Sequence, residues 1–276
     1  MRKMELGDMV ELDKIYCEDC LQTMSRMSDG FVDLTVTSPP YDNLRKYNGY
    51  SFDFENVANE LYRVTKPGGV VVWVVGDATV NGSETGTSFK QALFFKEIGF
   101  NLHDTMIYEK TSVAAYDPRN KRCKQAFEYM FVLSKGTPNV YNEIKDNPVK
   151  KKVAFHDAPH GRNADSKRAS GREPYKVEDY QARTNIWQYN VGFNCTTKDK
   201  DAFKHPAIFP EMLAADHIRS WSNEGDTVYD CFLGSGTTAK MAAVLKRHYI
   251  GSEISQEYFD IAQGRIAEVK QNPTLF

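Results

Sequence analysis

Five consecutive residues, Thr37-Ser38-Pro39-Pro40-Tyr41, combine hydroxyls, two prolines and an aromatic ring. Neither proline has an N–H with which to continue a β ladder, and each fixes its own φ at about −65°. The residue before a proline is driven into extended geometry, so Ser38 stands in a rigid turn with its oxygen facing outward. A flat substrate could donate an amine to the Ser38 hydroxyl and a proline carbonyl while its ring stacks on Tyr41. The alternative is that the prolines only terminate a strand.

A second stretch, from Thr227 to Thr238, has the pattern of a strand, a glycine turn and a helix. Gly234 and Gly236 allow the main chain to approach a ligand closely, and the helix N-terminus favours an anion such as a carboxylate. Asp230 precedes the turn, where it could meet an ammonium group, and Glu253 ends the next strand, where a carboxylate can bind ribose hydroxyls. The pattern Gly-Ser-Gly-Thr differs from the Gly-x-Gly-x-x-Gly of dinucleotide enzymes.

Together the two motifs resemble those of the S-adenosylmethionine-dependent DNA amino-methyltransferases. Their order, with the Ser38 turn first and the glycine turn last, resembles the permuted beta group of that family. One departure is Cys231, which stands where the family usually has proline. A small apolar thiol should preserve the packing there, but it adds a main-chain N–H and a thiol near the cofactor.

The resemblance implies direct methyl transfer from S-adenosylmethionine to an exocyclic amine of a DNA base. Ser38 and the Pro39 carbonyl would accept hydrogen bonds from the amine and free its lone pair, while Tyr41 would stack on a base flipped from the duplex. In the family, serine at the first motif position is commoner in cytosine-N4 enzymes and aspartate in adenine-N6 enzymes. Ser38 therefore favours cytosine N4, with adenine N6 as the alternative. The predicted catalytic residues are Ser38, Pro39, Pro40 and Tyr41.

The resemblance also implies a set of cofactor-binding residues. In the family an acidic residue at the position of Asp19 accepts a hydrogen bond from the adenine amine of the cofactor, although Asp19 could instead only cap the following helix. His205-Pro206 matches a stretch that lines the methionine end of the cofactor, with His205 itself expected to be structural. The predicted cofactor-binding residues are Asp19, Thr37, Pro206, Asp230, Phe232, Gly234, Ser235, Gly236, Thr237 and Glu253.

Alternating strands and helices are expected to position these motifs. Apolar runs predict strands at 14–19, 31–36, 70–75, 100–108, 127–133, 228–232 and 248–252, and helical spacing predicts helices at 20–27, 54–64, 89–98, 212–221, 237–246 and 256–270. We expect residues 66–69 to end the helix before them and residues 81–87 to form a loop. The alternation indicates an α/β fold. The resemblance implies a Rossmann-like methyltransferase fold in which a mostly parallel seven-stranded sheet has helices on both faces.

Charge is distributed unevenly along the chain. Residues 110–204 hold 19 Lys and Arg against 11 Asp and Glu, although the whole chain has a net charge of −2. Such an asymmetry indicates a nucleic-acid-binding face on an acidic scaffold, or else an ordinary solvated insertion. Residues 156–175 show neither helical spacing nor alternation, and we expect them to lack regular structure without a ligand. The predicted DNA-contacting residues are Arg119, Lys121, Arg122, Lys124, Lys151, Arg162, Arg168 and Arg172.

These features divide the chain into a catalytic half (residues 1–135), a target-recognition insertion (136–203) and a cofactor-binding half (204–276). Five scattered cysteines indicate a reducing compartment without disulfides, and the Cys17–Cys20 pair lacks the second pair that a zinc site needs. The longest apolar run, Val70–Val75, is too short to span a membrane, and the N-terminus lacks the apolar core of a signal peptide. We therefore expect a cytoplasmic protein with no membrane and no metal, and the resemblance implies that it is encoded by a bacterium, archaeon or phage.

Double-stranded DNA is the expected partner. The resemblance also allows a homodimer and a cognate restriction endonuclease in a restriction–modification system. Two other classes of function stay open from the sequence. One is a methyltransferase that acts on RNA, on protein or on a small molecule, and the other is a non-catalytic DNA-binding module that retains the fold. A cytosine-C5 enzyme is disfavoured, because its cysteine nucleophile usually follows proline and the chain has no Pro-Cys pair.

Overall fold

The computed structural model describes residues 9–40, 52–112, 121–149, 153–155, 174–176, 178–192, 196–197, 199, 202, 208 and 210–271. The chain divides into two compact units, one made of residues 1–142 and 185–276 and the other of residues 143–184. The predicted catalytic and cofactor-binding residues all belong to the first unit.

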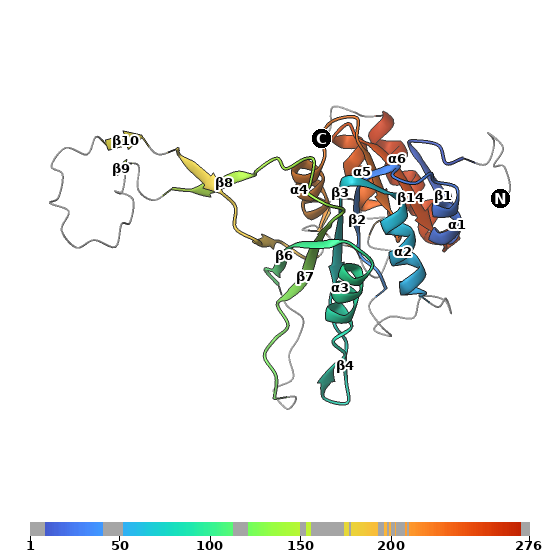
Figure 1. Ribbon diagram of the computed structural model, residues 1–276, viewed down its shortest axis with the longest axis horizontal. Coiled ribbons are helices and arrows are strands. Elements are labelled where there is room, and N and C mark those ends of the chain that lie inside the picture. Colours follow the sequence, from blue (N-terminus) through green and yellow to red (C-terminus); the bar gives the residue numbers. More distant parts are fainter. Residues whose placement is uncertain are drawn as a thin grey trace. The chain divides into compact units, whose positions relative to one another are not determined.

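The first unit is built on an eight-stranded sheet (Figure 1). Its strands are β1 (Lys14–Cys17), β2 (Val32–Thr37), β3 (Thr65–Val75), β6 (Asn101–Lys110), β7 (Phe127–Ser134), β12 (Ile186–Tyr189), β13 (Thr227–Asp230) and β14 (His248–Glu253). They lie in the order β1-β14-β13-β2-β3-β7-β6-β12, and β7 is antiparallel to both of its neighbours while the other pairs are parallel. The prediction of a mostly parallel Rossmann-like sheet is confirmed.

The sheet has one strand more than the seven that we predicted. The extra strand is β12, which lies at the sheet edge and pairs in parallel with β6. Its side chains alternate between exposed and buried, as expected for a short edge strand with one covered face. We did not predict β12, because it has only four residues and follows directly on the second unit.

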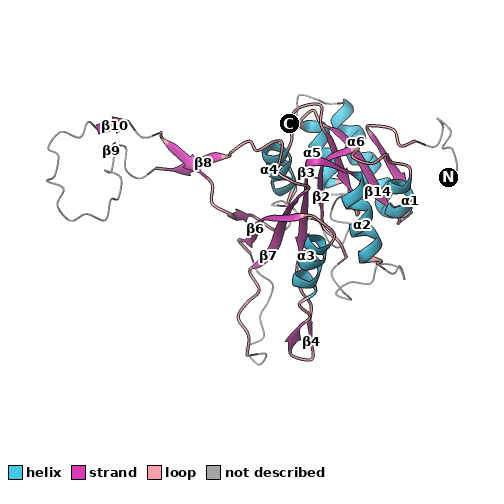
Figure 2. Ribbon diagram, viewed as in Figure 1, coloured by secondary structure: helices cyan, strands magenta, loops and turns pink. Residues whose placement is uncertain are grey.

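Helices cover both faces of the sheet. They are α1 (Cys20–Ser25), α2 (Phe54–Val64), α3 (Thr87–Glu97), α4 (Glu211–Trp221), α5 (Thr237–Val244) and α6 (Gln256–Gln271), shown in cyan in Figure 2. On one face Trp73 of β3 donates to Gln91 of α3 at 2.9 Å. Met130 of β7 points to the opposite face, where its sulfur lies 3.1 Å from Nε2 of His217 in α4. Within the described part of the chain, none of the helices is long and apolar enough to cross a membrane.

The core follows the apolar runs of the sequence. Residues Val70–Val75 of β3 are all buried, which confirms the prediction of a strand at the centre of the sheet. α2 has the predicted bounds and buries Val57, Ala58, Leu61 and Val64. Rings on the α1–α3 face interlock, and the centroid of Trp73 lies 5.1 Å from that of Phe95.

Two local predictions differ from the structure. Residues 66–69 were expected only to end a helix, but they belong to β3. The pairing of β3 with β2 shifts register at this point, opposite Asp33. Oδ2 of Asp33 pairs with Nζ of Lys66 at 2.7 Å. The expected loop at 81–87 contains part of a hairpin of β4 (Thr79–Val80) and β5 (Ser83–Glu84). The φ angles of Asn81 and Gly82 are 50° and 80°, and two positive φ values are what a type I′ turn requires.

The second unit consists of two antiparallel strand pairs. β8 (Lys145–Pro148) pairs with β11 (Tyr180–Ala182), and β9 (Val153–Phe155) pairs with β10 (Pro174–Lys176). Ion pairs join the first pair, from Lys145 to Glu178 at 2.8 Å and from Nε of Arg183 to Asp146 at 3.1 Å. Sequence patterning did not reveal β8 and β11, because ion pairs rather than an apolar face connect them.

Candidate active site

The predicted site residues follow strands that end at the same edge of the sheet. β1, β14, β13 and β2 are parallel neighbours, so their carboxyl ends lie side by side. Asp19, Glu253, Asp230 and Ser38 stand at or just after these ends. In open α/β sheets this edge is where ligands bind. The fold thus brings together residues that lie up to 234 positions apart in the sequence.

The Ser38 turn lies at the end of β2, as predicted. Thr37 and Pro39 are buried, whereas Ser38 and Pro40 are half-buried. The turn is therefore anchored at Thr37 and Pro39 and presents Ser38 at the edge of the sheet. Tyr41, the remaining member of the predicted catalytic set, lies outside the described residues.

Asp230 is the buried charge next to this turn. Its Oδ1 accepts hydrogen bonds from the Thr37 hydroxyl at 2.6 Å and from the main-chain N–H of Phe232 at 3.1 Å. Burial raises the pKa of Asp230 to about 6, and these hydrogen bonds oppose that rise. The bond to Thr37 directly links the end of β13 to the end of β2.

The glycine turn requires glycine at its last position. Gly236 has φ 83° and precedes α5, and a Cβ there would lie 2.8 Å from Cβ of Ala262 in α6. Ser235 and Thr237 beside it are buried. The first residue of the turn, Gly234, donates its N–H to Oε2 of Glu253 at 2.8 Å. The turn is thus packed against α6 on one side and bonded to the end of β14 on the other.

Glu253 and Phe232 border this turn. The second carboxylate oxygen of Glu253 accepts from the N–H of Ser255 at 2.8 Å, and burial raises the pKa of this carboxyl group. The ring of Phe232 meets Phe52 edge to face at a centroid distance of 5.2 Å. The two residues provide a fixed carboxylate and an apolar wall near the turn.

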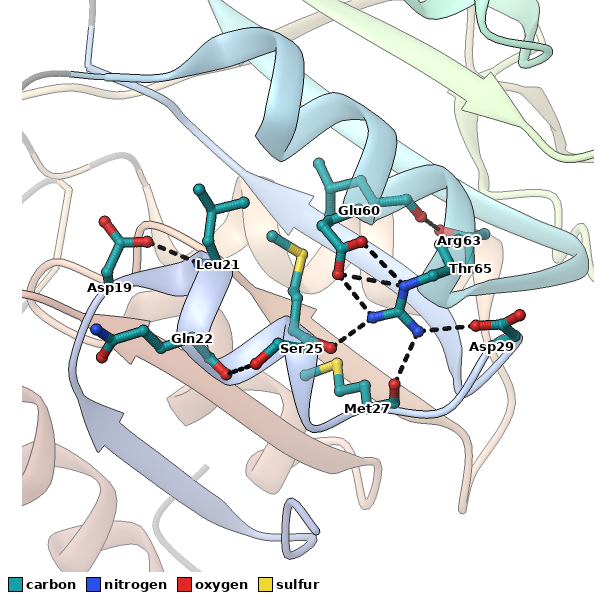
Figure 3. A network of polar contacts seen from close by, with 11 residues as sticks. Asp19, Leu21, Gln22, Ser25, Met27, Asp29, Glu60, Arg63 and Thr65 are labelled. Atoms are coloured by element: carbon teal, nitrogen blue, oxygen red, sulfur yellow. Dashed lines mark hydrogen bonds and ion pairs between the residues drawn. The ribbon is translucent and has the colours of Figure 1, made fainter. Parts of the chain in front are cut away.

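Asp19 acts as a helix cap in the structure. Its carboxylate accepts a hydrogen bond from the N–H of Leu21 at 2.8 Å, which makes Asp19 the N-cap of α1 (Figure 3). This is the capping role that the sequence analysis gave as the alternative, and a carboxylate has further lone pairs for a ligand. The role of Asp19 toward a cofactor therefore remains a prediction.

Three of the predicted DNA-contacting residues are described. Lys121 and Lys124 are exposed. Arg122 is half-buried and pairs with Glu84 of the β4–β5 hairpin at 3.4 Å. Glu84 therefore partly neutralises the charge of Arg122. The remaining predicted DNA-contacting residues lie outside the described residues: Arg119, Lys151, Arg162, Arg168 and Arg172. The predicted cofactor residue Pro206 lies outside them as well.

A cluster of buried charges beneath the glycine turn was not predicted from the sequence. Arg265 of α6 donates to the main-chain carbonyl of Ser235 at 2.5 Å and pairs with Glu211 of α4 at 2.8 Å. Lys240 of α5 pairs with the same Glu211 oxygen at 2.8 Å. From the sequence we expected residues 256–270 to form a helix. Arg265, which lies among the apolar residues of that helix, was a signal that we overlooked.

Known proteins share this architecture. The cytosine-N4-specific PvuII DNA methyltransferase superposes with a TM-score of 0.66 at 21% identity, covering 96% of this chain and 93% of the other. TTHA0409 from Thermus thermophilus, solved in complex with S-adenosyl-L-methionine, gives a TM-score of 0.61 at 21% identity and covers 95% of each chain. These likenesses confirm the fold class.

Sequence comparison identifies the family. The chain is 58% identical over 244 residues to the orphan methyltransferase M.BamHII of Bacillus amyloliquefaciens, covering 87% of this chain and 90% of the relative. It is 27% identical over 284 residues to the type II methyltransferase M.MthZI of Methanothermobacter thermautotrophicus, covering 89% and 74%. The model of the N6/N4 family, described as DNA methylase, matches residues 32–264. The chain therefore belongs to this family of DNA amino-methyltransferases, as its two motifs indicated.

Proposed function

We propose that the protein transfers a methyl group from S-adenosylmethionine to the exocyclic N4 amine of a cytosine in duplex DNA. The observation that carries the proposal is the hydrogen bond between Thr37 and Asp230. It joins the turn suited to an amine with the turn suited to a charged cofactor, at adjacent strand ends. The two reacting groups would therefore meet at one edge of the sheet.

Residues of the first strand end would position the amine. The lone pair of a cytosine amine is delocalised into the ring, so the nitrogen is a poor nucleophile. Hydrogen bonds from the amine to the Ser38 hydroxyl and the Pro39 carbonyl would favour a tetrahedral nitrogen with a free lone pair. Tyr41 would stack on the flipped base. The N–C bond forms as the S–C bond breaks, and the amine then releases one proton.

The second strand end would hold the cofactor, which supplies an electrophilic methyl group. Asp230 fits the ammonium group of the methionine part, since it is a buried carboxyl anchored by two donors. The N-terminus of α5 favours its carboxylate, and Glu253 fits the ribose hydroxyls. Asp19 is proposed to meet the adenine amine, and Pro206, Thr37, Phe232, Ser235 and Thr237 complete the predicted surface.

The choice of cytosine over adenine rests on Ser38 at the first position of the motif. Aspartate is commoner there in adenine-N6 enzymes, and both activities occur in the family that the chain matches. Adenine N6 is therefore the second candidate. The basic residues between 110 and 204 support DNA as the substrate, with lysines and arginines neutralising phosphates.

Nucleoside mass spectrometry of DNA from a methylation-free host that expresses the chain tests the proposal. N4-methylcytosine is the expected product, and a Ser38→Ala strain is the matched control. N6-methyladenine would retain the mechanism and overturn the assignment of the base. Absence of any methylated base, with a folded protein that binds S-adenosylmethionine, would overturn DNA as the substrate.

A further inference from the structure

Arg265 on α6 is the centre of the most buried charge cluster in the described part of the first unit. Its side chain is only 2% exposed and makes five hydrogen bonds. Nη1 donates to the carbonyl of Ser235, to the Ser235 hydroxyl and to the Thr237 hydroxyl, at 2.5, 3.0 and 3.3 Å. Nη2 donates to Glu211 at 2.8 Å and Nε to Asp199 at 2.6 Å. One guanidinium group thus joins three separate segments of the chain.

Among the described residues, the cluster is balanced in charge. Glu211 Oε1 accepts from Arg265, from Lys240 and from the Thr197 hydroxyl, each at 2.8 Å. Two cations therefore face two anions, Glu211 and Asp199, in a region with little solvent. Buried charges persist only when they are paired and hydrogen-bonded, so the four residues depend on one another.

Arg265 fixes one peptide plane of the glycine turn. The carbonyl of Ser235 accepts from Arg265, and the N–H of Gly236 in the same peptide donates to the carbonyl of Leu233 at 2.9 Å. Ala262, one helical turn before Arg265, is the residue that a Cβ on Gly236 would meet. α6 therefore holds the turn through both packing and hydrogen bonds, and the turn has little freedom to rotate.

We infer that Arg265 is a positioning residue for the cofactor, which holds the glycine turn and the beginning of α4 in one fixed arrangement. This inference rests on the proposed function, because it takes the turn as the binding site of S-adenosylmethionine. Glu211 is the first residue of α4, and the predicted cofactor residue Pro206 lies five positions before it. Loss of the guanidinium would release the turn and the start of α4 from each other and weaken cofactor binding. It would leave the end of β2, and so the methyl-transfer step itself, intact.

Arg63 provides a matched control within the same unit. It donates to the carbonyls of Met24 and Met27 at 2.7 and 2.8 Å and pairs with Glu60 and Asp29, so it joins the end of α1 to α2 (Figure 3). Like Arg265, which binds one main-chain carbonyl, Arg63 combines main-chain carbonyl acceptors with two carboxylates. These partners belong to the C-terminal end of α1, to α2 and to the segment between α1 and β2, and none belongs to the glycine turn or to the Asp19 cap. Loss of Arg63 should therefore affect stability far more than cofactor binding.

The test compares Arg265→Met, Arg265→Lys and Arg63→Met with the wild type. Titration calorimetry without DNA measures the Kd of S-adenosylmethionine, a thermal scan measures Tm, and turnover at saturating cofactor measures kcat. We expect Arg265→Met to raise the Kd at least tenfold with kcat within threefold. Arg265→Lys should recover part of the affinity, since an ammonium reaches some of the acceptors. Arg63→Met should lower Tm and change the Kd less than twofold.

Equal Kd values for Arg265→Met and Arg63→Met would overturn the inference. If Arg265→Met does not fold, Asp199→Asn decides, because it removes one charge partner of Arg265 while keeping an acceptor. We expect a Kd about threefold higher, and an unchanged Kd would contradict the positioning role. A folded wild type that does not bind S-adenosylmethionine would instead overturn the proposed function.

Discussion

The ends of β2 and β13 lie next to each other, yet they are built from different chemistry. The β13 end carries a buried carboxyl group, a glycine turn and charged supports from α4 and α6. The β2 end, Thr37 to Pro40, has no ionisable side chain and is shaped by two prolines. The first is suited to a charged ligand held by electrostatics, and the second to a neutral amine held by geometry. Because the two ends differ in this way, we expect separate mutations to weaken cofactor binding and methyl transfer independently.

The largest effect is expected from Ser38→Ala. Removing the hydroxyl takes away one acceptor for the amine in the transition state, and loss of one such group typically costs about 100-fold or more in kcat. The Kd of S-adenosylmethionine should stay within twofold of the wild type. Ser25→Ala, on the far end of α1 (Figure 3), is the matched control and should leave both quantities unchanged. A parallel loss of binding and turnover in Ser38→Ala would contradict the separation.

Asp230→Asn should produce the complementary change. The Asn oxygen can still accept from Thr37 and Phe232, so the substitution removes the charge and keeps the two hydrogen bonds. A hydrogen bond to a charged group contributes about 1.5–3 kcal/mol, which corresponds to a rise in the cofactor Kd of roughly 10- to 100-fold. Calorimetry measures the Kd, and Asp29→Asn, an exposed carboxylate paired with Arg63, is the control. A Kd within twofold of the wild type would contradict the electrostatic role.

The pH dependence of binding should report the same carboxyl group. Its pKa is raised to about 6 by burial, so the ionised form that attracts an ammonium is lost as the pH falls through 6. We expect the cofactor Kd to be constant above pH 7 and to rise below pH 6, and Asp230→Asn should remove this rise. Unfolding of the free protein should show the opposite sign. Because the pKa is higher in the folded state, the stability from this group is present at low pH and decreases as the pH rises through 6.

The smallest effect is expected from Thr37→Val. The change keeps the shape of the side chain and removes the hydroxyl that donates to Asp230. This hydrogen bond lowers the pKa of Asp230, so its loss should move the pH at which affinity falls to a higher value. At pH 8 the cofactor Kd should rise only a few fold, in line with about 1 kcal/mol for one hydrogen bond. An unchanged pH profile would show that the two strand ends are not coupled through this bond.

The sequence predicted the elements that carry their own local signal. The continuous apolar run Val70–Val75 and the helical spacing of α2 lie where they were expected. The Asn81-Gly82 pair, typical of a type I′ hairpin, was a local signal that we overlooked. Strand β8 has no local signal of this kind. It is held by β11 and by the ion pair from Lys145 to Glu178, and these partners lie more than 30 positions away in the sequence.

Within the site, the sequence predicted the residue types but not the contacts that join them. Ser38, Asp230, Gly236 and Glu253 each lie at or just after a strand end, as predicted, and the structure places these ends at one edge of the sheet. The bond from Thr37 to Asp230 spans 193 positions, and no pattern within one segment predicts it. Arg265 was missed because helical periodicity treats a charged residue as solvent-facing, whereas its acceptors come from segments distant in the sequence. Hydrogen bonds and ion pairs between buried polar groups that lie far apart in the sequence could therefore not be predicted from the sequence.

A single-turnover experiment tests most directly whether cofactor binding and methyl transfer can be separated by mutation. Wild type, Ser38→Ala and Asp230→Asn are each saturated with labelled S-adenosylmethionine, at concentrations set by their measured Kd values, and then mixed rapidly with unmethylated DNA. We predict that Asp230→Asn transfers the methyl group at a rate within fivefold of the wild type, while Ser38→Ala is slower by about 100-fold or more. A saturated Asp230→Asn complex that is as slow as Ser38→Ala would contradict the account.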